Sequence, residues 1–216
     1  FQLEGVPTRV KTLGDGFIND TFTIETEGDA PRYILQRKNT NIFKDIPGMM
    51  SNIQAITSHL KKKIAAAGGD PMRESLTVVP AIDGKLYHVH DGEYWCVTVF
   101  IEDSVSYDKA DTPLLAECGG RGIGRFQAML SDFDQPLVDT LPGFHNIRFR
   151  YGQWDATLAR DPEHRAESVR ELINEVESRR SEMLDFYRLI ETGEIPLRVT
   201  HNDTKIANML FDHDGN

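Results

Sequence analysis

The sequence contains few cysteines, no long apolar run and no signal-peptide pattern. Its two cysteines, Cys96 and Cys118, offer neither a metal-binding spacing nor a disulfide framework, so we interpret both as small core residues. Every apolar run is much shorter than the ~20 residues that a membrane-spanning helix needs. The first residues also lack the charged and then apolar pattern of a signal peptide. We therefore expect a cytoplasmic protein that has no membrane partner.

Basic residues are also in deficit, with 24 against 34 acidic residues and a formal net charge of −10. This balance disfavours nucleic acid as the main partner, because binding to phosphate backbones requires a basic surface. The 39% hydrophobic content of the 216 residues is typical of a globular chain with one sizeable core or two small lobes. The chain has no initiating Met and ends after Asp214-Gly215, a hairpin-turn signal with a strand predicted only before it. We expect it to be a piece of a longer chain.

The most informative stretch lies between Pro196 and Phe211, where the pattern predicts a strand, a polar loop and a second strand. Within the loop, Asp203 and Asn208 are five positions apart, which is the spacing of a kinase catalytic loop. In such a loop the Asp accepts the proton of the substrate hydroxyl and the Asn holds a metal ion. We expect Lys205 to add positive charge near the γ-phosphate.

An ordinary hairpin is the alternative, because His, Asn, Asp and Thr are all common turn residues. The apolar residues on both sides of the loop favour the catalytic interpretation, because they would form a rigid scaffold for it.

Near the start of the chain, Gly14-Asp15-Gly16 lies between two predicted strands, residues 9–13 and 21–25. A glycine turn between strands lets backbone amides approach phosphate oxygens, as in the glycine-rich loop of kinases. We therefore predict that Gly14, Asp15 and Gly16 bind nucleotide. A plain Asp-Gly hairpin is the alternative.

The third predicted strand covers residues 32–38, where a protein kinase carries its phosphate-binding lysine. The matching position here is Gln36, which we place in the nucleotide site. Arg37 and Lys38 are candidate replacements for the lysine, although strand alternation puts Arg37 on the opposite face.

Periodicity predicts one helix from Met49 to Ile64 and three further strands, at residues 76–80, 86–90 and 94–101. The last of these strands would end at a hinge, where the backbone groups of Phe100 and Ile101 could pair with an adenine edge. Burial of Phe100 in the core is the alternative, and both can hold.

Beyond the hinge, Thr112-Pro113 predicts the start of a helix that continues to Met129. The run Gly119–Gly124 inside it superficially matches a phosphate loop. No strand precedes that run, however, so we interpret it as close packing of the helix against a neighbour. Residues 132–149 are predicted to be a polar connection. A second helical region, with one apolar face, is predicted from Asp161-Pro162 to near Gly193.

Several of these segments resemble the aminoglycoside-phosphotransferase and choline-kinase-like small-molecule kinases, and among them the N-acetylhexosamine 1-kinases. The segments that carry the resemblance are Gly14–Asn19, Pro31–Gln36, Phe100–Glu102, Ser104–Tyr107, Gly124–Gln127 and Leu197–Lys205. The resemblance implies phosphorylation of the anomeric hydroxyl of N-acetylglucosamine or N-acetylgalactosamine, with ATP and Mg²⁺ as cofactors.

The same resemblance assigns Asp203 as the base, with Lys205 beside it, and Asn208 as a metal ligand. It places Asn202, Asp203 and Phe17 near the sugar. Relatives usually have a His where this chain has Phe17, so one sugar contact is expected to be lost.

We therefore predict an α+β, protein-kinase-like two-lobed fold. Residues 1–102 would form the nucleotide-binding N-lobe, an antiparallel sheet with one helix, and residues 103–216 would form the first part of a mostly helical C-lobe that ends just after the catalytic loop. The resemblance puts a second metal-binding Asp and the sugar-binding helices beyond residue 216, so we expect the 216-residue chain alone to be inactive.

Two alternatives remain open: a phosphotransferase for another small hydroxyl substrate of the aminoglycoside, choline or homoserine type, and a non-catalytic sensing pseudokinase, which Gln36 would permit. The sequence contains no indication of the oligomeric state.

Overall fold

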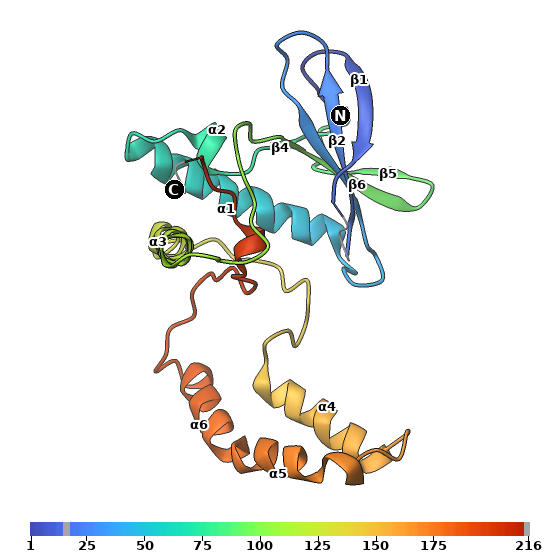
Figure 1. The fold of residues 1–216 in the computed structure, drawn as a ribbon, viewed down its shortest axis with the longest axis vertical. Coiled ribbons are helices and arrows are strands. Elements are labelled where there is room, and N and C mark those ends of the chain that lie inside the picture. The colour runs from blue at the N-terminus through green and yellow to red at the C-terminus, as the bar shows by residue number, and fades with distance from the viewer. Residues whose placement is uncertain (15–17, 214–216) are drawn as a thin grey trace. The chain divides into compact units, whose positions relative to one another are not determined.

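The computed structural model of the chain describes residues 1–14 and 18–213. Its strands are β1 (Pro7–Thr12), β2 (Asp20–Thr26), β3 (Tyr33–Lys38), β4 (Val78–Val79), β5 (His88–His90) and β6 (Glu93–Val99). Its helices are α1 (Ile46–Ala66), α2 (Pro71–Glu74), α3 (Pro113–Met129), α4 (Ile147–Arg160), α5 (Arg170–Ser178) and α6 (Arg180–Glu191), with short 3-10 turns η1 (Glu167–Val169) and η2 (Ile206–Asn208) (Figure 1).

The chain forms two compact units, one of residues 1–140 with 199–216 and one of residues 141–198. The predicted lobe boundary after Glu102 lies inside the first unit and stays a prediction. No helix in the described part of the chain is long and apolar enough to cross a membrane.

The sheet of the first unit is antiparallel throughout, in the order β1-β2-β3-β6-β4, with β5 paired to the first half of β6. All six strands occur where alternation predicted them. Tyr33 and Val97 belong to an apolar cluster on one face of the sheet, whereas Cys96 belongs to a second cluster on the other face. This division follows from the alternation of side chains along a strand.

Helix α1 joins the sheet to α3. It begins at Ile46, three residues before the predicted start, because the Asp45 side chain caps it by accepting a hydrogen bond from the Gly48 amide at 2.8 Å. Ile46 packs with Cys96 of the sheet, whereas Ile64, further along α1, packs with Leu130, which directly follows α3. Figure 1 shows α1 running away from the sheet in this direction.

Helix α3 confirms the predicted start, since the Thr112 side chain accepts a hydrogen bond from the Leu115 amide at 3.1 Å. The run Gly119–Gly124 is helical and therefore forms no phosphate loop. A Cβ atom at Gly119 would lie 3.3 Å from Ile206 Cδ1 and 3.4 Å from Met209 Cε. Close packing thus explains Gly119, but it does not explain the other glycines of the run, around which there is open space.

The two strands predicted at residues 197–199 and 209–211 do not form. Instead, the loop contains η2, and the described residues around it make a single antiparallel bridge, between Val105 and Phe211. An apolar segment forms a strand only where another strand offers backbone partners, and here only Phe211 finds one among the described residues. Leu197 is 79% exposed. The predicted turn at Asp214-Gly215 lies outside the described residues.

The second unit differs most from the prediction. Helix α4 was not predicted, and its first residues belong to the expected polar connection. Asp161 ends this helix in the left-handed conformation, with φ 35°, rather than starting a new one. Its side chain then accepts hydrogen bonds from the Arg165 and Ala166 amides, at 3.0 and 3.2 Å, and so caps the turn that follows.

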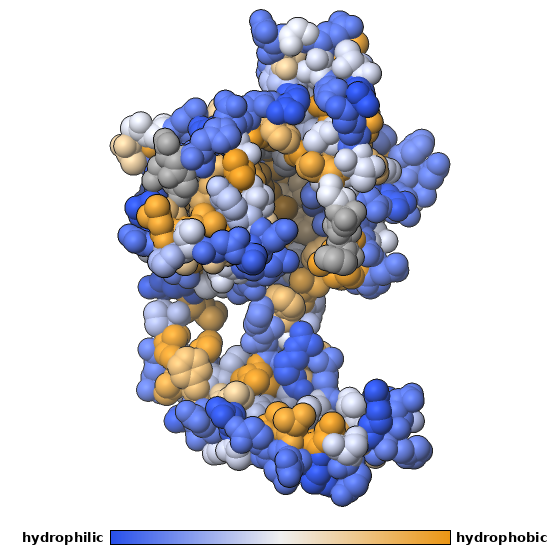
Figure 2. Space-filling view, viewed as in Figure 1, coloured by the Kyte–Doolittle hydropathy of each residue, from blue (hydrophilic) through white to orange (hydrophobic). Residues whose placement is uncertain are grey.

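The predicted helical region from 161 to 193 is divided into η1, α5 and α6, and it ends before Gly193 as predicted. Its apolar face is only partly covered within the unit. Ile173 is buried, whereas Leu172 and Phe186 are 66% and 59% exposed. Figure 2 shows apolar side chains at the surface of this unit.

The predicted α+β, protein-kinase-like fold is confirmed: an antiparallel sheet with one long helix is followed by a mostly helical part. The interpretation of Cys96 and Cys118 as core residues is also confirmed, since both are buried and neither forms a disulfide.

Candidate active site

The polar loop turns sharply at Asn202. This residue has a φ of 63°, in the left-handed region that Asn tolerates better than most residues. The Thr200 hydroxyl donates a hydrogen bond to Asn202 Oδ1 at 2.6 Å. The turn leads directly into Asp203.

Asp203, Lys205 and Asn208 lie close together in the loop. The Asn208 amide group donates hydrogen bonds to Asp203 Oδ2 at 2.7 Å and to the Asp203 carbonyl oxygen at 3.0 Å. Lys205 Nζ is 3.9 Å from Asp203 Oδ2. The side chains of Asp203 and Lys205 are about 60% exposed, so a ligand can reach them. Their chemical roles stay predictions.

The same cluster could hold part of a magnesium site. Because the NH₂ group of Asn208 faces Asp203, its amide oxygen is left for another partner, next to a carboxylate. Oxygen ligands of this kind suit Mg²⁺, which usually takes one or two carboxylates together with substrate phosphates. Within residues 1–14 and 18–213, no group of three or more His, Cys, Asp and Glu side chains could hold a metal.

The loop is fixed by the segment that follows the predicted hinge. The backbones of Val105 and Phe211 exchange hydrogen bonds of 2.8 and 2.9 Å, and the Ser106 hydroxyl donates to the Ala207 carbonyl at 3.3 Å. The Tyr107 ring meets the Phe211 ring edge-on, with centroids 5.5 Å apart. On the α3 side, the Phe126 ring meets the His201 ring at 6.0 Å. The loop is thus held by a rigid helix and by the chain leaving the predicted adenine site.

At the predicted adenine site, several backbone groups are already engaged. The Phe100 amide donates to the Arg32 carbonyl at 2.9 Å, and the Ile101 carbonyl accepts from the Ser104 hydroxyl at 2.6 Å. The Arg32 guanidinium covers the Phe100 ring at 4.2 Å. Among the described residues, the Phe100 carbonyl and the Ile101 amide make no hydrogen bond. These two groups could therefore pair with the edge of a base.

Arg73, in the short helix α2, is a residue that sequence reasoning missed. Its guanidinium donates to the carbonyl oxygens of Glu102 and Asp103, at 2.6 and 2.9 Å. Asp103 has a left-handed φ of 50°, so Arg73 holds the hinge at the point where its backbone turns. No sequence pattern could have predicted this contact. Every residue has a backbone carbonyl oxygen, so the partner of such an arginine can be of any residue type.

The predicted phosphate turn is only partly described. Gly14 has a left-handed φ of 66°, as a tight turn requires. Asp15, Gly16 and Phe17 lie outside the described residues. The far end of the turn is fixed where Asn19 Oδ1 accepts a hydrogen bond from the Asn39 amide at 3.1 Å.

Gln36 is engaged on both sides. Its amide group donates to the Thr21 hydroxyl at 3.2 Å, and its oxygen accepts from Lys38 Nζ at 2.6 Å. Gln36 therefore links β3 to β2 just after the glycine turn. Among the described residues, no hydrogen bond joins Gln36 to the loop around Asp203.

Asp203 and Asn208 are thus hydrogen-bonded within one loop, and backbone bonds between Phe211 and Val105 tie this loop to the segment that follows the sheet. The family model described as "Phosphotransferase enzyme family" matches residues 9–216, and the chain belongs to this family.

Among solved structures, a spectinomycin phosphotransferase in complex with ADP and spectinomycin is similar over 69% of this chain, with 12% identity and a TM-score of 0.35. The match covers 43% of that protein, so the chain spans less than half of its length. A likeness of this size carries no argument about function.

Proposed function

We propose that the protein transfers the γ-phosphoryl group of ATP to the anomeric hydroxyl of an N-acetylhexosamine in the cytoplasm. The observation that carries the phosphotransferase part is the Asp203–Asn208 pair, with Lys205 close by, on a loop held by packing on both sides. Phosphoryl transfer requires mainly positioning and charge stabilisation, which a fixed loop with these groups can supply.

Each residue has a separate role in this proposal. Asp203 accepts the proton of the attacking hydroxyl, and Lys205 stabilises negative charge on the transferred group. The Phe100 carbonyl and Ile101 amide bind the adenine edge, in a nucleotide-binding lobe of residues 1–102. Asn208 offers an amide oxygen to Mg²⁺, which when bound neutralises charge on the β- and γ-phosphates. Asn202 and Phe17 are proposed to face the acceptor.

The acceptor rests on the resemblance of the sequence to N-acetylhexosamine 1-kinases. A panel with ATP and Mg²⁺ tests it on the full-length protein, using N-acetylglucosamine, N-acetylgalactosamine, an aminoglycoside, choline and homoserine. The matched control is the methyl glycoside of N-acetylglucosamine, in which the anomeric hydroxyl is blocked. We expect turnover with a free N-acetylhexosamine and none with the glycoside. If only an aminoglycoside, choline or homoserine is turned over, that compound and not an N-acetylhexosamine is the acceptor.

Asp203→Asn tests the base. Removing a general base typically costs 10²- to 10⁴-fold, so we expect turnover to fall by about that factor while the Kd for ATP changes little. Steady-state turnover and calorimetric titration with ATP measure the two quantities. Unchanged turnover would remove Asp203 from the reaction.

A non-catalytic nucleotide or sugar sensor is a second candidate, and one observation favours it. Gln36 occupies the position of the kinase lysine, and both ends of its amide are already bonded within the sheet. A sensor would bind ATP or the sugar and would turn over no acceptor of the panel.

A further inference from the structure

Lys38 is a buried lysine that has no acidic partner among the described residues. It is 8% exposed and forms the end of β3. In the described part of the chain, its Nζ atom makes one hydrogen bond, to the neutral Gln36 Oε1 at 2.6 Å. Helix α1, which packs on this face of the sheet, contains no Asp or Glu in its 21 residues. The lysine therefore receives no carboxylate from the helix that covers it.

Such a position is costly for a cation. Burial lowers the pKa of Lys38, because a charged amine loses water that a neutral partner does not fully replace. The nearby titratable groups include Tyr94, which is opposite Lys38 in the register of β3 and β6, and Cys96. Burial raises the pKa of the Cys96 thiol to about 11, so it is uncharged at neutral pH. An ammonium group has three donors, and Gln36 uses one. Two donors are thus left for a ligand that carries negative charge.

The position of Lys38 in the sheet indicates which ligand it would bind. Asp20 pairs with Arg37 in the register of β2 and β3, so Lys38 lies level with Asn19, the last residue of the glycine turn. The Asn19–Asn39 hydrogen bond fixes the two chain segments at this point. Lys38 also shares a strand face with Gln36, two residues away, where the kinase lysine would be.

We propose that Lys38 is a phosphate-binding residue that takes the role of the lysine absent at Gln36, and that Gln36 positions its amine. The ligand is a phosphate group of the bound nucleotide, so this inference rests on the proposed function for the nucleotide itself. The charge, which is costly without a partner, becomes paired when the phosphate binds, and the hydrogen bond to Gln36 keeps the amine in place.

Lys38→Met tests the proposal, with Lys44→Met as the matched control. Lys44 is an exposed lysine whose Nζ donates to the Thr40 carbonyl at 3.0 Å. Hydrogen bonds to charged groups are strong, so we expect Lys38→Met to raise the Kd for Mg-ATP by roughly 10- to 100-fold. The Kd for adenosine, which has no phosphate, should change less than about threefold. Lys44→Met should change neither Kd.

The melting temperature without nucleotide gives an independent readout. Replacing a buried, unpaired cation by an apolar side chain of similar length removes its desolvation cost, so we expect Lys38→Met to melt at a higher temperature. If Lys38→Met has a lower affinity for ATP and a higher melting temperature, Lys38 serves nucleotide binding at a cost in stability. If Lys38→Met does not fold, Lys38→Gln, which keeps a donor but not the charge, is measured in the same way.

Two results would overturn the proposal: an unchanged Kd for ATP, or equal losses for ATP and adenosine. A wild-type protein that binds no ATP would overturn it together with the proposed function. ATP binding that depends on Lys38, without turnover of any acceptor, would support the role of Lys38 and overturn the proposed catalysis.

Discussion

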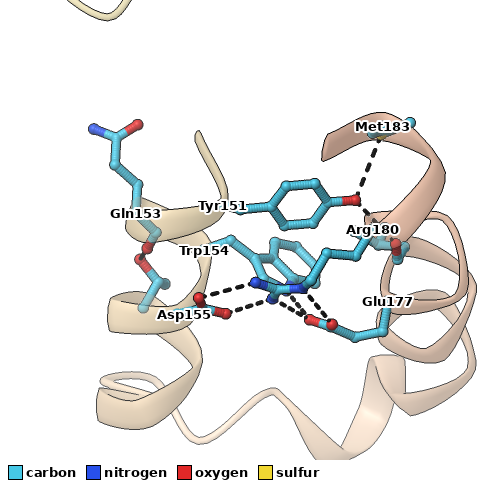
Figure 3. A network of polar contacts seen from close by, with 9 residues as sticks. Tyr151, Gln153, Trp154, Asp155, Glu177, Arg180 and Met183 are labelled. Atoms are coloured by element: carbon cyan, nitrogen blue, oxygen red, sulfur yellow. Dashed lines mark hydrogen bonds and ion pairs between the residues drawn. The ribbon is translucent and has the colours of Figure 1, made fainter. Parts of the chain in front are cut away.

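The two compact units join their helices in different ways. In the first unit, α1 and the end of α3 meet through buried apolar side chains, with Ile64 and Leu130 almost fully buried. In the second unit, an arginine connects the helices. Arg180 of α6 donates to Asp155 of α4 at 3.0 Å and to Glu177 of α5 at 2.7 and 2.8 Å (Figure 3).

Aromatic residues complete this polar network. The guanidinium of Arg180 lies over the Tyr151 ring at 4.4 Å, and the Trp154 indole donates to Glu177 at 2.8 Å. The Tyr151 hydroxyl contacts the Val176 carbonyl and the Met183 sulfur, at 3.2 and 3.4 Å. A unit joined in this way is specific in geometry but buries few apolar side chains. We therefore expect it to be less stable than the first unit and more sensitive to pH.

The two tryptophans allow each unit to be followed separately. Trp95 lies in β6 and Trp154 in α4, and the chain has no other tryptophan. Fluorescence of Trp154→Phe reports the first unit, and fluorescence of Trp95→Phe reports the second.

Ile64→Ala should have the largest effect on stability. Ile64 is 0% exposed, and its truncation leaves a cavity between α1 and α3, so we expect the free energy of unfolding to fall by about 2–5 kcal/mol. Urea unfolding followed at Trp95 measures it. Ile82→Ala is the matched control, because Ile82 is 77% exposed and its truncation should change stability by less than about 0.5 kcal/mol. Equal losses of unfolding free energy in Ile64→Ala and Ile82→Ala would contradict the placement of Ile64 in the core.

Arg180→Met should loosen only the second unit. It removes the ion pairs to Asp155 and Glu177 but keeps an apolar side chain against Tyr151. We expect faster hydrogen exchange in α5 and α6 and earlier unfolding at Trp154, with no change at Trp95. Arg179→Met is the control, because Arg179, at the junction of α5 and α6, forms its ion pair in the described residues with Glu175, four residues earlier. Equal changes in hydrogen exchange and in unfolding at Trp154 for the two variants would show that the Arg180 network does not join these helices.

Acid should affect the second unit through the same network. The hydrogen bond from Arg180 lowers the pKa of Asp155, and hydrogen bonds from Arg180 and then Trp154 lower the pKa of Glu177. A carboxylate with a lowered pKa in the folded state contributes stability above its ordinary pKa, here 3.8 for Asp and 4.5 for Glu, and loses it as pH falls further.

We therefore expect the Trp154 melting temperature to decline as pH falls below about 4.5, and to decline less steeply in Arg180→Met. A pH dependence that is the same in both proteins would show that other carboxylates cause it.

The smallest effects are expected at the glycines of α3. Gly120 has open space around it, so Gly120→Ala should stabilise the first unit by about 0.4–1 kcal/mol. Gly119→Ala brings the same gain in helix propensity, but its Cβ would press on Ile206 and Met209 of the catalytic loop. It should therefore stabilise less and speed hydrogen exchange around Asp203. Equal stabilisation by both changes would show that the contact with the loop is not tight.

The sequence by itself determined the features that depend on neighbouring residues. Strand alternation indicated the sheet, the Thr112-Pro113 pair indicated the start of α3, and the five-residue spacing of Asp203 and Asn208 placed both in one short loop, where they are hydrogen-bonded. These signals are local, because a strand face, a helix cap and a short loop are all set by the backbone within a few residues.

Only the tertiary structure decided the features that depend on what lies opposite a residue. The apolar residues around the loop were expected to form strands, but a strand requires partners, and Phe211 meets only Val105. Arg73 reaches the hinge from a distant helix. The sequence named Lys38 only as one of two candidate replacements for the kinase lysine, and the tertiary structure decided that it is buried on the sheet face where a helix without acidic residues packs. Burial and charge pairing are properties of the assembled chain, so no local pattern contains them.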